Sequence, residues 1–215
     1  ELDAVASIAV ENDLFVICDE VYREFVFDGG AVRSFTSYQD LAERIIVVDS
    51  VSKRFNACGV RIGCMASHNR EVVDVALRFC QARLSVPTAE QLMVVPLLEH
   101  GRAYSERLCG EYQARRDAVY AGLANIDGVT PNRSEGSFYS MTRLPIDSCE
   151  DFAVWILRDF EHQGRTICLA PGEGFYVTPG SGFDEVRIAF MYDALTLGGA
   201  MEVLKAAVEQ YPGRL

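Results

Sequence analysis

Short apolar runs alternate with longer amphipathic stretches along most of this 215-residue chain. The runs at 14–18 (LFVIC) and 45–49 (IIVVD) are rich in β-branched and aromatic residues, and their length favours buried strands. Residues 69–83, 88–100 and 103–124 instead repeat their apolar side chains at helical spacing. Because such strands and helices alternate, the sequence predicts an α/β fold.

The character of the chain changes after the turn signal at Asp127–Gly128. We therefore predict two domains, residues 1–125 and 126–215. Asn69 and Thr88 are expected to cap the helices that follow them. Further strands are predicted at 61–66, 137–144, 166–170 and 185–191, and further helices at 1–12, 37–43, 149–163 and 194–210.

The most informative segment is DSVSKRFNACGVRIG (49–63), which follows directly on the apolar run 45–49. In α/β sheets, ligands bind at the carboxyl ends of strands. Lys53 is expected there in a loop, where an amine beside a fixed cation can act as a nucleophile toward carbonyls. Arg61 can bind a phosphate through two parallel hydrogen bonds, and Ser50 can add a further donor. The alternative reading of Lys53 alone is a solvated loop lysine.

The pattern S-x-S-K followed by G-x-R-x-G resembles the cofactor-attachment segment of class I/II aminotransferases of fold type I, which use pyridoxal 5'-phosphate (PLP). The resemblance implies that Lys53 is the catalytic residue, which forms a Schiff base with PLP and shuttles a proton. It also implies that Ser50 and Arg61 bind the PLP phosphate. In this reading the chain is the C-terminal half of such an enzyme. Residues 1–125 are part of the PLP-transferase large domain, with a mostly parallel sheet and helices, and residues 126–215 are an α+β small domain.

A second segment, VICDEVYREFVF (16–27), places Asp19 at the end of an apolar run. A buried carboxylate needs a cationic partner, and a protonated pyridine nitrogen is such a partner. D-E-x-Y after a hydrophobic strand is similar to the family's motif, with Asp19 at the ring nitrogen and Tyr22 at the ring hydroxyl. Taken alone, the segment could equally be an Asp that caps a turn beside a core tyrosine.

A third segment, GFDEVRIAF (182–190), places Arg187 between Val186 and Ile188. A buried arginine needs an anion. In the family that this chain resembles, an arginine in such a strand binds the α-carboxylate of the substrate, so Arg187 is the candidate substrate-binding residue. The alternative is an arginine exposed on an edge strand.

Family members carry a comparable stretch upstream, with a phosphate-binding loop, a ring-stacking aromatic residue and an N-P-T-G type loop, and those motifs are absent from residues 1–215. We therefore expect a fragment, whose sheet presents an unpaired edge or an uncovered face. The cofactor site would lie open on one side. PLP binding and catalysis by this chain alone should accordingly be weak.

Composition excludes several other classes of protein. The net charge of −11 argues against a nucleic-acid partner, because phosphate-rich partners require a basic face. Seven scattered cysteines without a C-x-x-C pair indicate free thiols in a reducing, cytoplasmic location rather than a metal site. No apolar run reaches membrane-spanning length. The resemblance implies a homodimer.

The resemblance implies transamination between an amino acid and a 2-oxo acid, of the aspartate or aromatic type. Another fold type I enzyme, such as a C–S lyase or a synthase, would use the same residues and stays open. A truncated chain without catalytic activity is the remaining alternative.

Overall fold

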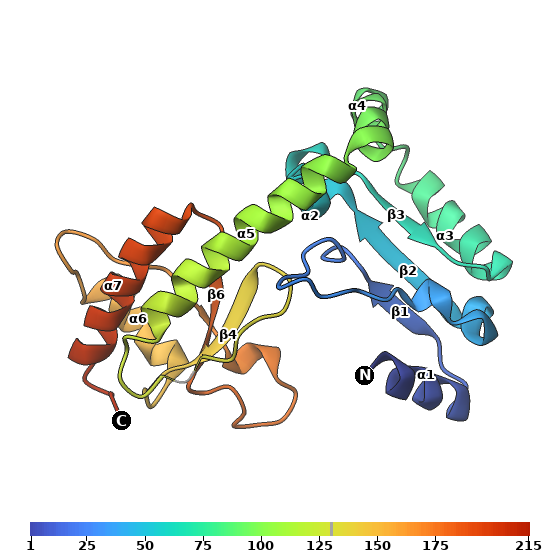
Figure 1. Ribbon diagram of the computed structural model, residues 1–215. Helices are drawn as coiled ribbons and strands as arrows, with labels where there is room; N and C mark the ends of the chain where they lie inside the picture. The colour runs from blue at the N-terminus through green and yellow to red at the C-terminus, as the bar shows by residue number, and fades with distance from the viewer. Residues whose placement is uncertain (130) are drawn as a thin grey trace. The chain divides into compact units, whose positions relative to one another are not determined.

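The computed structural model describes residues 1–129 and 131–215, which form two compact units, Glu1–Cys109 and Gly110–Leu215 (Figure 1). The division between the units falls within the long helix α5 (Arg102–Leu123). The functional domain boundary near residue 125 stays a prediction. In both units strands and helices alternate, which confirms the α/β class.

The first unit contains a three-stranded sheet in the order β1-β2-β3, formed by Val16–Asp19, Ile45–Ser50 and Gly63–Ala66. β1 and β2 are parallel, with Asp19 opposite Val48, whereas β3 runs antiparallel to β2. The parallel pair places the carboxyl ends of β1 and β2 at the same edge of the sheet. The segments that follow these two strands are the ones predicted to bind the cofactor.

The helices of the first unit begin largely where their capping residues predict. Asn69 caps α3, and its side chain accepts a hydrogen bond of 3.0 Å from the Val72 amide, as expected. The predicted cap Thr88 is wrong by one residue: α4 has Pro87 at its N-cap position, without a side-chain hydrogen bond. The elements are α1 (Leu2–Glu11), α2 (Val51–Arg54), α3 (Arg70–Ala82) and α4 (Thr88–His100), with 3₁₀ helices η1 (Phe35–Ser37), η2 (Gln39–Arg44) and η3 (Cys58–Val60).

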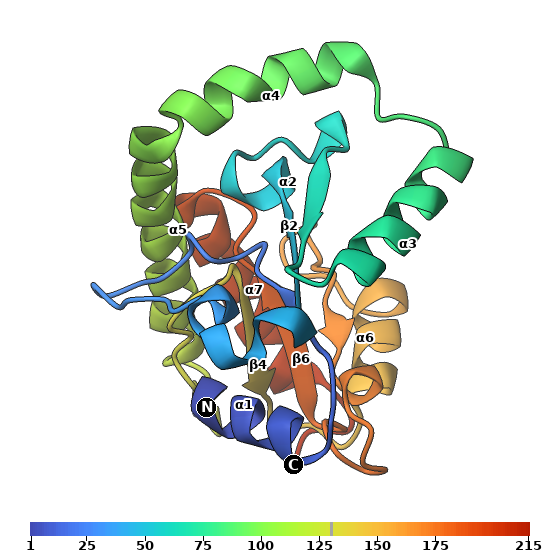
Figure 2. The ribbon, with the colours of Figure 1, turned by 90° about the vertical axis from the view of Figure 1, so that its right-hand side faces the viewer.

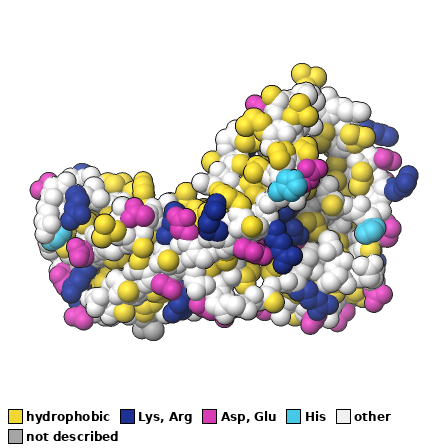
Figure 3. Space-filling model, turned by 45° about the horizontal axis from the view of Figure 1, so that its top comes forward, with side chains coloured by type: hydrophobic (Ala, Val, Ile, Leu, Met, Phe, Trp, Pro, Cys, Tyr) yellow, Lys and Arg dark blue, Asp and Glu magenta, His cyan; other side chains and the backbone are white. Residues whose placement is uncertain are grey.

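Two apolar clusters contribute to the core of the first unit. One packs α1, β1 and β2 together around Cys18, Ile45 and Val47. The other packs α2 against α4 through Val51, Phe55 and Val94. Many apolar side chains remain outside both clusters. Figure 3 shows hydrophobic side chains (yellow) on the surface around α4.

The second unit contains an antiparallel sheet in the order β4-β6-β5, formed by Tyr139–Arg143, Glu185–Ala189 and Ala170–Pro171. Helices α6 (Cys149–Arg158) and α7 (Ala194–Gln210) lie beside the sheet (Figure 2). The 3₁₀ helix η4 spans Glu173–Phe175. Ser148 and Asp193 cap α6 and α7 through their side-chain oxygens. The core is built from one face of the sheet and from α7, which buries Leu197, Met201, Val203, Leu204, Ala206, Ala207 and Val208.

The strand predicted at 166–170 is mostly wrong, because only Ala170 and Pro171 pair with β6. Thr166 instead uses its hydroxyl to donate a hydrogen bond of 2.8 Å to the carbonyl of Ile156. Within the residues that the structure describes, no helix combines the length and the apolar character needed to cross a membrane.

Candidate functional site

The predicted cofactor residues of the first unit gather at the carboxyl edge of its sheet. Asp19 is the last residue of β1 and Ser50 the last residue of β2, the strand next to it. Ile62 is brought to the same place, because its carbonyl accepts hydrogen bonds from the Val51 amide (3.2 Å) and the Ser50 hydroxyl (3.0 Å). The segment carrying Arg61 therefore lies beside the start of the Lys53 segment.

Lys53 lies in the single turn of helix α2 and not in a loop, which corrects the sequence-based expectation. Ser50 begins this turn as its N-cap, and its hydroxyl oxygen accepts from the Ser52 amide at 3.0 Å. A serine that follows a strand and precedes helical residues was a readable signal for such a cap. The Ser50 hydroxyl also lies 2.7 Å from the Ser52 hydroxyl, so its donor and acceptor sites are both engaged.

Lys53 is one of only two lysines in the chain, the other being Lys205 in α7. Lys53 is partly buried at the sheet edge. Lys205 is exposed, with 46% of its side chain accessible, and its amine lies 3.9 Å from the carboxylate of Glu209. The two amines thus have contrasting surroundings within one chain, which makes Lys205 an internal reference for the reactivity of Lys53.

Arg61 adopts a left-handed backbone conformation at φ 58° and ψ 38°, where it ends the 3₁₀ helix η3. A non-glycine residue in this region costs free energy and is common at ligand-binding sites. Its guanidinium is exposed and donates one hydrogen bond of 2.9 Å to the carbonyl of Cys58. The remaining N–H groups face solvent, where they can bind an anion.

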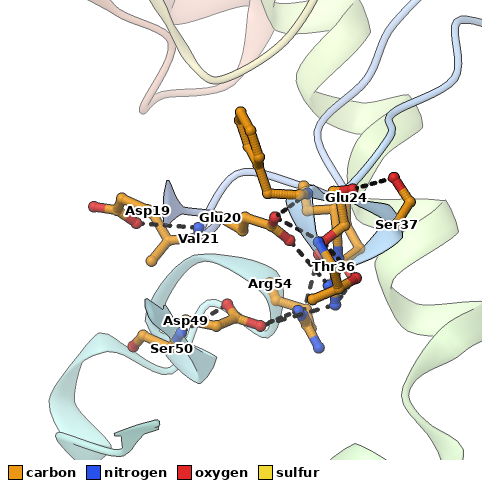
Figure 4. Close-up of polar contacts among 12 residues, drawn as sticks. Asp19, Glu20, Val21, Glu24, Thr36, Ser37, Asp49, Ser50 and Arg54 are labelled. Carbon is orange, nitrogen blue, oxygen red and sulfur yellow. Dashed lines mark hydrogen bonds and ion pairs between the residues drawn. The ribbon is translucent and has the colours of Figure 1, made fainter. Parts of the chain in front are cut away.

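Asp19 is exposed, contrary to the expectation of a buried carboxylate. Its side chain accepts a hydrogen bond of 3.2 Å from the Val21 amide and so caps the turn that follows β1 (Figure 4). Among residues 1–129 and 131–215 no cation forms an ion pair with it. Solvent therefore stabilises the charge of this carboxylate, which stays accessible to a cationic ligand group.

Tyr22 lies half-buried in the same turn, and its ring meets that of Phe25 edge-on at a centroid distance of 6.2 Å. Glu20 has a structural role, because its carboxylate accepts hydrogen bonds from the Ser34 hydroxyl at 2.7 Å and from the Phe35 amide at 3.1 Å. The turn is thus held to the following loop while Asp19 and Tyr22 remain at the edge.

A cluster of charged side chains beside this edge was not predicted from the sequence. Arg54 forms ion pairs with Asp49 and with Glu24, the latter at 3.1 Å, and Arg23 reaches Glu20 at 3.3 Å (Figure 4). The Arg54–Glu24 pair joins segments that are far apart in the chain, whereas the other two pairs are local. Local sequence patterns contain no signal for such pairing.

Arg187 lies in β6, the middle strand of the second sheet, so the alternative of an edge strand is wrong. Val186 and Ile188 are buried, and Arg187 therefore projects from the opposite face of the sheet. Its guanidinium carbon lies 4.7 Å from the centroid of the Tyr139 ring and 4.9 Å from that of Phe175. These contacts are cation–π interactions of ordinary length.

Arg187 is half-buried, and no carboxylate within the described parts of the chain forms an ion pair with it. The two aromatic rings replace the anion that the sequence argument expected. Nearby, Glu185 accepts from the Tyr176 hydroxyl, which raises the pKa of Tyr176. The edges of the Arg187 guanidinium can still bind a carboxylate while its faces contact the rings.

Comparison with known proteins gives the family. Residues 1–202 match the family model for aminotransferase class I and II. Aromatic-amino-acid aminotransferase 2 of Thermococcus litoralis is 30% identical over 200 residues, covering 91% of this chain and 49% of that enzyme. Aspartate aminotransferase of Pyrococcus abyssi is 28% identical over 200 residues, with the same shares covered. The chain thus spans about half the length of the curated relatives it matches.

Solved structures agree with this match. N-succinyldiaminopimelate aminotransferase from Mycobacterium tuberculosis is 30% identical and superimposes with a TM-score of 0.84, over 96% of this chain and 53% of that one. An aromatic aminotransferase from Pyrococcus horikoshii OT3 is 27% identical with a TM-score of 0.83, over 97% and 55% of the two chains. The chain therefore belongs to the aminotransferase class I and II family, as its S-x-S-K and G-x-R-x-G motifs predicted.

Proposed function

We propose that this chain supplies cofactor- and substrate-binding residues of a PLP-dependent aminotransferase, which moves an amino group between an amino acid and a 2-oxo acid. The observation that carries the proposal is the common position of Asp19, Ser50 and Lys53 at the carboxyl ends of two adjacent parallel strands. The segment that carries Arg61 is hydrogen-bonded to Ser50 through the carbonyl of Ile62. Residues 1–125 would form part of the large domain and residues 126–215 the small domain.

The donors and charges at this edge fit PLP. The exposed guanidinium of Arg61 has free donors for a phosphate, and the Ser50 hydroxyl can join it by exchanging its contact with Ser52. The exposed carboxylate of Asp19 can hold a protonated ring nitrogen, and Tyr22 in the same turn can contact the ring hydroxyl. When bound, PLP would supply an electron sink for the bond-breaking step.

The roles of the chain's own residues follow from their chemistry. Lys53 would hold the cofactor covalently through its amine, and the same amine could move a proton at the substrate α-carbon. Arg187 binds the α-carboxylate through two parallel hydrogen bonds. The flanking Tyr139 and Phe175 rings restrict the orientation of its guanidinium.

The names of the relatives support an aspartate or aromatic substrate. Both activities occur among them, in the Pyrococcus abyssi and Thermococcus litoralis enzymes. We further propose that the protein acts as a homodimer in the cytoplasm. Its seven free thiols favour a reducing compartment.

Covalent trapping of PLP on Lys53 tests the proposal. We expect excess PLP followed by borohydride to modify Lys53 in preference to Lys205, since only Lys53 lies among phosphate-binding groups. Peptide mass spectrometry measures the two occupancies. Binding should be weak, because the edge of the sheet is open to water. Lys53→Arg should remove the preferred adduct and Lys205→Arg should leave it. Equal modification of both lysines would show that Lys53 has no special site.

A further inference from the structure

We infer that Arg54 is a positioning residue, which clamps the helical turn carrying Lys53 to the turn carrying Asp19 and Tyr22. The inference rests on the proposed function, because it concerns the placement of the proposed cofactor-binding lysine. The clamp consists of Arg54 with Asp49 and Glu24 (Figure 4).

The Lys53 segment needs anchors outside itself. Helix α2 spans only Val51–Arg54, and so short a helix is not stable on its own backbone hydrogen bonds. Its first turn is fixed by the Ser50 cap, and Val51 with Phe55 packs in the second apolar cluster of the unit. Lys53 lies between these anchors, and its direct neighbour Arg54 is the last residue of the turn.

Asp49 connects the two ends of the turn. One of its carboxylate oxygens accepts from the Ser50 amide at 2.7 Å, at the start of α2. Its other oxygen accepts a hydrogen bond from the Arg54 guanidinium at the end of α2. The side chains of Asp49 and Arg54 are each 15% exposed, so solvent screens their ion pair only weakly. One carboxylate therefore holds both ends of the turn that presents Lys53.

Glu24 extends the clamp to the other cofactor-binding segment. It lies 3.1 Å from Nε of Arg54, and it follows Tyr22 by two residues. Arg23 adds a second link, since it lies 3.3 Å from Glu20 and 3.8 Å from Asp49. Ion pairs thus join the two segments that carry the proposed cofactor residues, in addition to the backbone pairing of β1 with β2.

Removal of Arg54 would leave an excess of negative charge in this cluster of side chains. Three carboxylates, on Glu20, Glu24 and Asp49, share two guanidinium groups. Without Arg54, Glu24 and Asp49 would both lose a partner, and their like charges would repel. We therefore expect the two turns to separate when the clamp is broken, with a loss of the geometry around Lys53.

The first measurement follows the turn itself, without cofactor. Hydrogen exchange of the amides of 51–55 should become about tenfold faster in Arg54→Gln, because the turn opens locally more often. Glu24→Gln should give a smaller increase, since it leaves the Asp49–Arg54 pair intact. The matched control is Arg44→Gln, which removes another arginine of the same unit from its ion pair with Asp13. Unchanged exchange in Arg54→Gln would overturn the clamp.

The second measurement follows the amine. With PLP and borohydride, trapping on Lys53 should fall about tenfold in Arg54→Gln, while trapping on Lys205 stays constant. Arg54→Lys keeps the charge and should recover trapping to within about threefold of the parent chain. A purely structural defect would not be rescued in this way, so an Arg54→Lys variant as poor as Arg54→Gln would overturn the positioning role. If the parent chain shows no preference for Lys53, the proposed function fails, and the exchange result alone decides the clamp.

Discussion

The two units of the molecule cover their apolar surface to different extents. In the second unit, α7 buries a continuous stripe that includes Leu197, Met201 and Leu204. In the first unit, α3 is more strongly amphipathic by sequence than α7 yet buries no residue, and every residue of β3 is exposed. Phe79 of α3 is 74% exposed. The helices of the second unit thus cover its core, whereas those of the first unit leave part of its sheet uncovered.

This difference concerns function, because the proposed cofactor residues lie in the open unit. Ile17 of β1 is 70% exposed, and β1 has no second partner among the strands that the structure describes. The expected open edge and uncovered face are therefore confirmed. Apolar surface of this kind marks a site of interaction. We therefore expect charged contacts such as the Arg54 clamp to help order the Lys53 segment, together with the packing of Val51 and Phe55.

The strongest test of this contrast compares one aromatic side chain in each unit. Phe152 is fully buried in the second unit, where its ring meets Tyr211 at 4.9 Å. Phe152→Ala should lower the free energy of unfolding by about 3–5 kcal/mol, because it leaves a cavity. Phe79→Ala should change it by less than about 0.5 kcal/mol. Urea unfolding followed by circular dichroism measures both. Equal losses would mean that α3 is covered in solution.

A glycine pair on α5 tests how tightly the second unit is packed. A Cβ atom added at Gly122 would lie 2.3 Å from Cβ of Met201, whereas one at Gly110 would meet no atom within 4 Å. Gly122→Ala should therefore cost about 1–3 kcal/mol through overpacking. Gly110→Ala should stabilise the helix by roughly 0.8–1 kcal/mol. Unfolding monitored by Trp155, the single tryptophan of the chain, reports both.

A double substitution tests the contact between Gly122 and Met201 directly. Met201→Gly combined with Gly122→Ala should cost less than the sum of the two single losses, since it removes the Cβ and Cγ atoms that the new methyl group meets. Strictly additive losses in the double variant would contradict close contact between α5 and α7.

Much of the fold was predictable because its signals are local. The apolar runs before Asp19 and Asp49 marked β1 and β2, and Asn69 marked the start of α3 through a cap within three residues. The candidate site was predictable for the same reason, because the S-x-S-K segment directly follows a strand. The fold class could be read because helices and strands differ in period.

The remaining features depend on partners distant in sequence. Residues 166–169 have strand-forming side chains, but no strand in the described parts of the chain pairs with them, so β5 consists only of Ala170–Pro171. The burial expected for Asp19 required a covered sheet, and the sheet is open there. The Arg54 clamp joins residues 24, 49 and 54, a combination that no periodic pattern encodes.

The smallest expected effect concerns the helix caps, which differ in chemistry between the two units. Asn69 caps α3 with an amide, and Asp193 caps α7 with a carboxylate that accepts from the Thr196 amide (3.0 Å) and hydroxyl (2.7 Å). Asn69→Ala should weaken α3 by about 1 kcal/mol at any pH, because an amide does not titrate. Hydrogen exchange of the α3 amides measures this effect. The fold-increase of the variant over the parent chain should be the same at pH 4 and pH 7.

The hydrogen bonds from Thr196 hold the pKa of Asp193 below its ordinary value. A carboxylate with a lowered pKa stabilises the folded state above the pKa of the unfolded chain, and this contribution is lost as the pH falls through the folded value. Asp193→Asn keeps an acceptor but cannot titrate. Its unfolding free energy, followed at Trp155, should therefore decline less steeply than that of the parent chain as the pH falls below the ordinary aspartate pKa. Parallel declines in the two chains would show that the charge of Asp193 does not stabilise α7.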